Sequence, residues 1–333
     1  MPLVPGRQIL EEALKGGYGV GAFNVNNMEQ IQSIMMAARE TQSPVIIQAS
    51  RGALKYSNLI YLHHLMLAAA EENPDIPLAM HLDHGNNLES AKTAVGLGFT
   101  SVMIDGSLKE DGKTPTTYQE NVDVTSAVVQ YCHKFGVSVE GEIGTLGGIE
   151  DGVGSGQIHL TDPDQAITFI KATKLDYLAL AIGTSHGAYK FKVAPKLATD
   201  IVDKVRAKTP IPLVMHGSSS VPKELVDEIN KYGGKMPNTM GVPIPAIQEC
   251  IKKGVAKINV DTDGRLAITG AIRKVFAEEP SKFDPRDYLT PARAAHAKVV
   301  AARMREFGAA GHAKDYKCIT LEDNKAYYAS KGL

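Results

Sequence analysis

The chain has 333 residues, a length that suits one large domain or two of ordinary size. Its 36 Lys and Arg residues balance 37 Asp and Glu residues, so no overall positive field is available to hold a nucleic acid or an anionic membrane. The hydrophobic share of 44% permits a full core, and no apolar stretch predicts a membrane span or a secretory leader. Three scattered cysteines fit neither a disulfide framework nor a CxxC zinc site, which favours a cytoplasmic protein.

Short apolar runs alternate with amphipathic segments along the chain. The expected strands span 20–24, 44–50, 77–83, 101–105, 137–143, 177–183, 211–217 and 255–261, and the expected helices span 28–40, 58–72, 88–98, 119–136, 163–174, 195–208 and 265–279. This alternation predicts a (β/α)8 barrel, the TIM-barrel fold of the α/β class. The alternative is an open, doubly wound sheet, but the first run is not followed by the GxGxxG turn typical of that fold.

The C-terminal region contains more helix than a barrel needs. A further helix is expected over 292–308, so we predict a single barrel domain over 1–333 with a C-terminal helical extension from about 280 to 333. A Gly/Pro-rich insertion is expected over 231–246, between the helix that follows the seventh strand and the eighth strand itself. Extensions of this kind often pack on a neighbouring subunit, which predicts a homo-oligomer, either a dimer or a tetramer.

Most of the expected strands end in a side chain that could carry chemistry. These strand-end residues are Asn24, Ser50, Asp83, Asp105, Glu142, His186, His216, Asn259 and Asp261. In a parallel barrel the carboxyl ends of all strands meet at one rim, where TIM-barrel enzymes hold their active sites. The sequence therefore predicts an enzyme with its active site at this rim.

Three histidines at strand ends predict a metal site. His84, His186 and His216 end the third, sixth and seventh strands, and each is followed by glycine. Imidazole nitrogens suit Zn²⁺, and three protein ligands leave a coordination position for a substrate. Asp83 could move a proton on a substrate or orient a ligand histidine, and both roles stay open. Glu142 is interpreted as an outer or alternate metal ligand.

The loops after the fifth to eighth strands complete the expected site. Residues 144–156 form a Gly-rich segment with the character of a lid, and its Glu150 could reach a substrate carbon. Small, donor-rich turns follow the last three strands and suit a phosphate group. Lys190 could add a positive charge there, and Asp261 could bind substrate hydroxyls.

Six motifs together resemble the class II, metal-dependent fructose-1,6-bisphosphate aldolases, in particular their tetrameric subgroup. The motifs are HLDHG, EGEIGTLGGIEDG, GTSHGAYK, HGSSS, NVDTD and FDPR, and the resemblance runs from about residue 3 to the end of the chain. It implies a zinc-dependent lyase that reversibly cleaves D-fructose 1,6-bisphosphate to dihydroxyacetone phosphate and D-glyceraldehyde 3-phosphate through a metal-stabilised enediolate. The reaction belongs to glycolysis, gluconeogenesis or the Calvin cycle. Aldolases acting on tagatose or sedoheptulose bisphosphate share much of this motif set and are the alternative.

The resemblance also implies roles for individual residues. His84, His186 and His216 correspond to zinc ligands, Glu142 to a residue that can ligate the metal, and Asp105 to an acid near it that could serve a second divalent site. Asp83 corresponds to the acid/base on the C4 hydroxyl and Glu150 to the residue that exchanges a proton with dihydroxyacetone phosphate. The residues at the family's substrate, phosphate and monovalent-cation (Na⁺ or K⁺) positions are Asn24, Ser50, Gly187, Lys190, Gly217, Ser219, Asn259, Asp261 and Thr262. Arg286 corresponds to the arginine that reaches the distal phosphate of a neighbouring subunit's substrate.

The sequence departs from the family pattern at one position, and two alternative functions are considered. Gly264 occupies a position where many relatives carry leucine or another bulky residue. A Schiff-base aldolase would need a lumen lysine, and Lys257 on the eighth strand is the candidate. A non-catalytic sugar-phosphate-binding barrel would be expected to lack Asp83 or a histidine ligand, and all of these are present.

Overall fold

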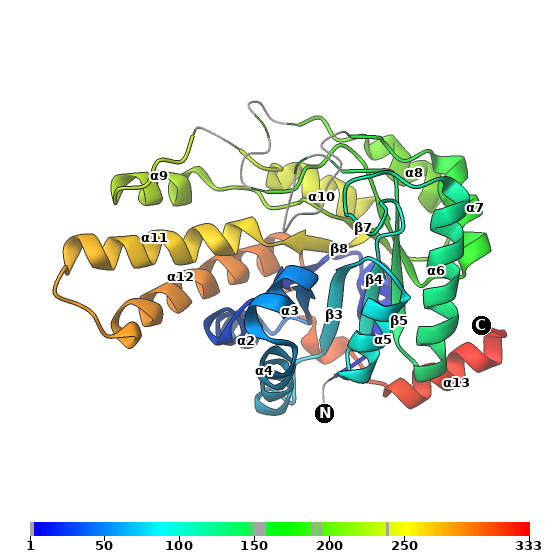
Figure 1. Ribbon diagram of the computed structural model, residues 1–333, viewed down its shortest axis with the longest axis horizontal. Helices are drawn as coiled ribbons and strands as arrows, with labels where there is room; N and C mark the ends of the chain where they lie inside the picture. The colour runs from blue at the N-terminus through cyan, green and yellow to red at the C-terminus, as the bar shows by residue number, and fades with distance from the viewer. Residues whose placement is uncertain (1–2, 147, 149–157, 188–190, 192–194, 238–239) are drawn as a thin grey trace.

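Parallel strands close into a barrel at the centre of the molecule (Figure 1). The computed structural model describes residues 3–146, 148, 158–187, 191, 195–237 and 240–333. Within these ranges the strands are β1 (Val20–Asn24), β2 (Val45–Ser50), β3 (Leu78–Gly85), β4 (Ser101–Ile104), β5 (Ser138–Ile143), β6 (Tyr177–Leu180), β7 (Leu213–Met215) and β8 (Val255–Val260). Each strand pairs with the next, and β8 pairs with β1. The predicted TIM barrel and all eight expected strands are confirmed.

Helices cover the outside of the barrel and both of its flanks. They are α1 (Gly6–Gly16), α2 (Met28–Thr41), α3 (Arg51–Ser57), α4 (Leu59–Glu72), α5 (Leu88–Gly96), α6 (Tyr118–Cys132), α7 (Pro163–Thr173), α8 (Thr199–Arg206), α9 (Lys223–Lys231), α10 (Ile244–Lys252), α11 (Thr262–Glu278), α12 (Pro285–Glu306) and α13 (Leu321–Lys331). Sequence analysis did not predict α1, α3, α10 or α13. The Gly/Pro-rich segment 231–246 leads from α9 into the first turn of α10 rather than directly to β8, because Pro243 and Pro245 suit a helix start.

The two ends of the chain close the N-terminal end of the barrel together. The backbone amide of Arg7 in α1 donates to Ser138 Oγ at the start of β5, over 3.0 Å. The Arg7 guanidinium donates to Asn324 Oδ1 of α13 and lies 3.7 Å from the ring centroid of Tyr327. Tyr328 of α13 donates to Asp176, just before β6. Because these contacts join the first and last helices to each other and to β5 and β6, α13 packs as part of the same folded unit as the barrel.

Helices α11 and α12 form an arm that extends away from the barrel (Figure 1). The expected start of the last long helix at residue 292 was wrong: Asp284 caps α12 and Pro285 occupies its first position, a combination typical of a helix start. At the base of the arm, a Cβ atom added to Gly264 would lie 2.3 Å from Nε2 of His296, so this glycine permits a close approach between α11 and α12. Among the described helices, none combines the length and apolar character needed to span a bilayer.

The interior of the barrel changes from apolar to polar along its axis. Near the N-terminal end the lumen is filled by small or branched side chains such as Ala22, Ile46 and Val214. Towards the carboxyl ends of the strands, inward positions carry polar groups that are also buried, including Glu140 and Lys257. A polar barrel interior is costly unless each group finds a partner, so this layer indicates a functional site rather than simple packing.

Candidate active site

The three strand-end histidines converge at the rim of the barrel. The ring centroid of His84 lies 5.1 Å from that of His186 and 4.9 Å from that of His216. One nitrogen from each ring belongs to a group whose ligand atoms all lie within 4.8 Å of one another. His84 has φ of 50°, in the left-handed region that a side chain other than glycine rarely adopts, and such strain persists where the surrounding structure fixes it. The donor set fits a metal that prefers imidazole nitrogen.

A second possible ligand group shares His84. Its other members are Asp105 and Glu142, both buried. Burial and the nearby charge of Asp105 raise the pKa of Glu142 well above its ordinary value. Burial opposes protonation of His84, but the charge of Asp83 and the hydrogen bond to Asp105 outweigh it and raise the pKa of His84 to about 10. Carboxylates crowded in this way around an imidazole favour a bound cation.

Asp83 is held by a ring of amide side chains beside the histidines. Asn24 donates to Oδ2 of Asp83 over 2.9 Å, Gln48 donates to the same oxygen over 3.3 Å, and Asn259 approaches Oδ1 at 3.4 Å. Gln48 also donates to Asn24 Oδ1 over 2.6 Å. In the register of β2 and β3, Ser50 lies beside Asp83. These amides carry no charge and hold the carboxylate of Asp83 in place beside the histidines.

The loops after β6, β7 and β8 pack against one another. Gly187 and Gly217 both have positive φ, and a Cβ atom on Gly217 would lie 2.6 Å from the carbonyl oxygen of Ser185. Ser219 Oγ accepts a hydrogen bond from the backbone amide of Asp261 over 3.2 Å. Backbone amides and hydroxyl groups thus gather at the side of the rim where TIM barrels bind phosphate.

A buried ion pair supports the loop after β7 from the arm. Asp263 in α11 accepts hydrogen bonds from the backbone amides of Ser220 and Val221, at 3.1 and 2.8 Å. Arg303 of α12 donates to the same carboxylate over 2.9 Å, and both side chains are buried. The arm therefore helps to set the shape of the loop that contains Ser219.

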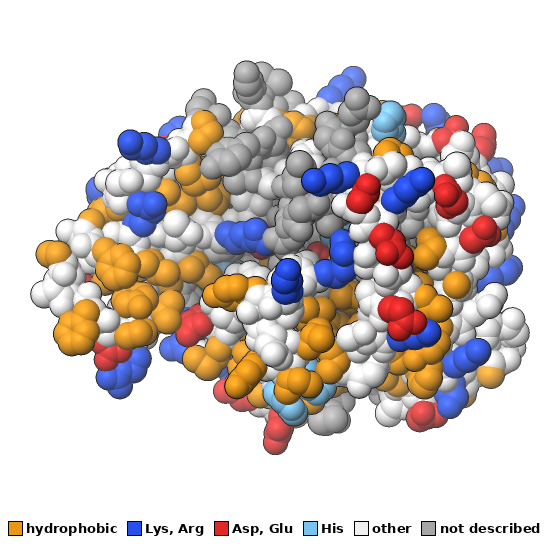
Figure 2. Space-filling view, in the orientation of Figure 1, with side chains coloured by type: hydrophobic (Ala, Val, Ile, Leu, Met, Phe, Trp, Pro, Cys, Tyr) orange, Lys and Arg blue, Asp and Glu red, His pale blue; other side chains and the backbone are white. Residues whose placement is uncertain are grey.

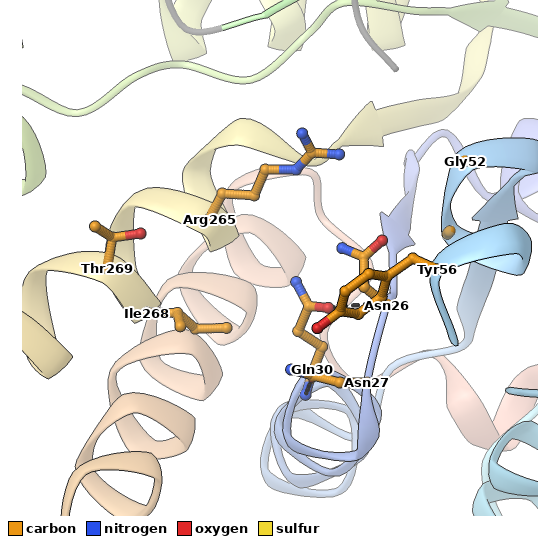
Figure 3. Close-up of a pocket in the computed structure, with 9 residues that line it drawn as sticks. Asn26, Asn27, Gln30, Gly52, Tyr56, Arg265, Ile268 and Thr269 are labelled. Carbon is orange, nitrogen blue, oxygen red and sulfur yellow. Dashed lines mark hydrogen bonds between the residues drawn. The ribbon is translucent and has the colours of Figure 1, made fainter. Parts of the chain in front are cut away.

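A pocket of about 550 Å³ opens beside the ends of β1, β2 and β8 (Figure 3). Arg265 points toward the pocket from the first turn of α11, and Tyr56 and Asn26 face it from the other side. The Arg265 guanidinium pairs with Asp261, with Nε 2.8 Å from Oδ1. The pocket lies next to the end of β1, which carries Asn24, and next to the ends of β2 and β8, so it continues the rim on that side.

Comparison with known proteins places this arrangement in a family. The family described as "Fructose-bisphosphate aldolase class-II" matches residues 4–312. The chain belongs to this family. The family and the lyase class predicted from the six motifs are thereby confirmed, and membership in the family implies a divalent metal.

Relatives of this aldolase cover nearly all of its length. It is 58% identical over 330 residues to a fructose-bisphosphate aldolase of Giardia intestinalis, covering 98% of this chain and 100% of that protein. Identity to the fructose-bisphosphate aldolase of Pseudomonas aeruginosa is 51% over 345 residues, covering 99% and 98% of the two chains. Among solved structures, the YdjI aldolase of Escherichia coli K12 has a TM-score of 0.75 at 28% identity, covering 93% of this chain and 99% of that one.

Of three further predicted residues of the aldolase site, the structure describes only Arg286. Glu150 and Lys190 lie outside the described residues. Arg286 lies in the first turn of α12 on the arm, where its side chain is 88% exposed and pairs with Asp284 of the same chain. Within one chain Arg286 is not part of the histidine site, and its role toward a neighbouring subunit stays a prediction.

Sequence reasoning also missed residues that support the aldolase site. Gln48 lies two positions before Ser50 on β2, so strand alternation could have placed both side chains in the lumen. Arg265 follows Asp261 by four positions, which predicts a contact once a helix start is recognised there. Asp263 is in the NVDTD motif, but its buried bonds to the loop after β7 have no local sequence signal.

Proposed function

We propose that this aldolase reversibly cleaves fructose 1,6-bisphosphate to dihydroxyacetone phosphate and glyceraldehyde 3-phosphate, with zinc as its divalent metal. The observation that carries the proposal is the convergence of three imidazoles beside the carboxylate of Asp83, which shares the Asn259 amide with His216. His84, His186 and His216 would hold the zinc. A cation bound there supplies Lewis-acid stabilisation of the negative charge that develops on the ketose carbonyl oxygen.

Two carboxylates are proposed to move protons. Asp83 takes the proton of the C4 hydroxyl as the C3–C4 bond breaks, since the amides of Asn24 and Gln48 hold its Oδ2 in place. Glu150 then returns a proton to the carbon of the dihydroxyacetone phosphate fragment. We assign the nearby acids Glu142 and Asp105, together with His84, to an alternate or second divalent position.

The remaining rim residues are proposed to bind substrate. Gly187, Gly217, Ser219, Asn259 and Thr262, with Lys190, would hold one phosphate and a monovalent cation, Na⁺ or K⁺. Asn24, Ser50 and Asp261 would contact the sugar hydroxyls. The packing of the loops after β6 and β7 against each other supports this assignment, because it lets backbone amides point to one place.

We further propose a homo-oligomer acting in the cytoplasm. Hydrophobic side chains gather on the arm (Figure 2), and among them Phe283 is 90% exposed and Phe276 is 47% exposed. Exposed apolar surface of this kind suits a second copy of the chain. In that assembly Arg286 would reach the distal phosphate of the neighbouring subunit's substrate. Mixed oligomers of Arg286→Ala and Asp83→Ala subunits should then recover sites with normal KM, and verified mixed oligomers without such recovery would remove this role.

Chelation followed by metal add-back tests the proposed chemistry. A strong chelator should abolish cleavage of fructose 1,6-bisphosphate, and Zn²⁺ should restore it in proportion to the metal bound. The tagatose epimer, assayed alongside, should be cleaved more slowly; faster cleavage of the epimer would reassign the substrate. Activity that survives chelation and is lost on borohydride treatment with substrate would instead indicate a Schiff base.

A further inference from the structure

Directly beneath the histidines, two oppositely charged side chains meet inside the barrel. Glu140 on β5 and Lys257 on β8 are both fully buried, and Lys257 Nζ lies 2.8 Å from Glu140 Oε2. Neither residue is among those that we assign to metal, substrate or proton transfer. Replacing such a pair by apolar side chains is often neutral or stabilising, so stability alone does not account for it.

The second oxygen of Glu140 connects this pair to the histidine cluster. Glu140 Oε1 lies 2.6 Å from Nε2 of His216. The other ring nitrogen of His216, Nδ1, lies 3.2 Å from Nε2 of His84 and faces the remaining ligand candidates. The imidazole is therefore bound at one nitrogen by the carboxylate and presents the other to the metal position.

This geometry selects one form of the imidazole. A carboxylate only accepts hydrogen bonds, so Nε2 of His216 carries the hydrogen in its bond to Glu140. In a neutral ring, Nδ1 then has a free electron pair, which is the form that binds a metal. The amide nitrogen of Asn259 lies 3.1 Å from the same Nδ1 and can only donate there, so it favours the form that Glu140 selects. Without Glu140, Nε2 would lose its acceptor, and the ring would be held by the Asn259 contact alone.

Lys257 explains how Glu140 can fill this role in a dry interior. A buried carboxylate without a cation is strongly disfavoured. The ammonium group of Lys257 balances that charge at Oε2 and leaves Oε1 to His216. Held in this pair, Lys257 is also poorly placed to attack a substrate carbonyl.

We propose that the Glu140–Lys257 pair is a positioning device that fixes the ring orientation and tautomer of His216 for metal binding. The inference rests on the proposed function of His216 as a metal ligand. Neither Glu140 nor Lys257 contacts the metal or the substrate in this account, and both act through His216.

The test compares metal binding in three variants and one control. Glu140→Gln removes the charge with little change in shape, Lys257→Met removes its partner, and the double variant removes both without leaving an unpaired charge. Asp176→Asn is the control, because it also removes a buried carboxylate but at the opposite end of the barrel. Purified metal-free proteins are titrated with Zn²⁺ against a competing chelator and with Co²⁺, whose visible spectrum reports ligand geometry.

Glu140→Gln and the double variant should bind Zn²⁺ about 10- to 100-fold more weakly and show an altered Co²⁺ spectrum. Asp176→Asn should keep the wild-type metal affinity and spectrum, even if it unfolds at a lower temperature. Wild-type affinity and spectrum in the double variant would overturn the inference, and this variant serves if Glu140→Gln alone does not fold. A wild-type protein that binds metal but does not cleave fructose 1,6-bisphosphate would count against the proposed function only, since the metal titrations are independent of turnover.

Discussion

Acidification should destabilise the protein through His296, a buried histidine at the base of the arm. Its side chain is 3% exposed, one ring nitrogen is hydrogen-bonded to Ser33, and the other faces Gly264. Burial lowers the pKa of His296 from 6.5 to about 4. The folded protein therefore keeps the ring neutral at pH values where the unfolded chain already binds a proton, so stability falls as pH drops.

The magnitude follows from the separation of the two pKa values. The contribution of His296 to the free energy of unfolding is fully present above pH 6.5 and decreases as the pH falls toward 4. At about 1.4 kcal/mol per pH unit, the total loss is about 3 kcal/mol. Replacing His296 by Asn keeps a hydrogen-bonding group for Ser33 but removes the titration. The cavity left by the substitution should lower the free energy of unfolding by the same amount at every pH. Because only wild type loses stability through His296 on acidification, the total deficit of the variant relative to wild type should shrink by about 2 to 3 kcal/mol between about pH 7.5 and pH 4.5.

Urea unfolding of the metal-free proteins at several pH values measures this difference. The site histidines are present in both proteins, so their contribution cancels in the comparison. His64→Asn, at an exposed position of α4, controls for the replacement of a histidine outside the arm. A deficit of His296→Asn that stays constant from neutral to acid pH would refute the argument.

Further predictions concern the site and the base of the arm. Asp83→Ala should lower the rate of fructose 1,6-bisphosphate cleavage about 10²- to 10⁴-fold with an unchanged zinc content by metal analysis; near-normal turnover would exclude it as the base. Arg303→Met should lower the free energy of unfolding in urea by about 3–5 kcal/mol, because it leaves Asp263 buried without its cation, and Asp263→Asn added to it should recover part of that loss. Gly264→Leu should cost about 1–3 kcal/mol or more through a clash with His296, and its cost should fall in a His296→Ala background; equal costs in both backgrounds would contradict the contact.

The barrel was predictable because its strands are short buried runs with clear limits. Once eight parallel strands are inferred, the rim positions of His84, His186 and His216 follow from topology without any knowledge of side-chain contacts. The same reasoning placed Asp83 beside the histidines, and the structure adds the amides that hold it. The local sequence pattern and the barrel topology together were sufficient to predict the positions of these residues at the rim.

Other features depend on contacts between distant parts of the chain. The contact between Glu140 and His216 joins different strands across the lumen, and alternation alone could only show that Glu140 points inward. Helix α13 docks through Asn324 and Tyr328, polar or aromatic residues that give it no distinct apolar stripe. Arg286 was chosen for its motif, whereas the arginine that the fold brings beside Asp261 is Arg265.

The contact between α1 and α13 across the N-terminal end of the barrel also affects the order in which the chain folds. The bonds between Arg7 and Asn324 join residues 317 positions apart, and β1 pairs with β8 only after six strands have been added. Contacts so distant in sequence carry a large loop-closure cost and form late, once shorter-range pairings exist to offset it. A nascent chain that has made all eight strands still exposes the polar groups around Asp176 until α13 arrives. Synthesis must therefore reach α13 before the barrel is closed at both ends.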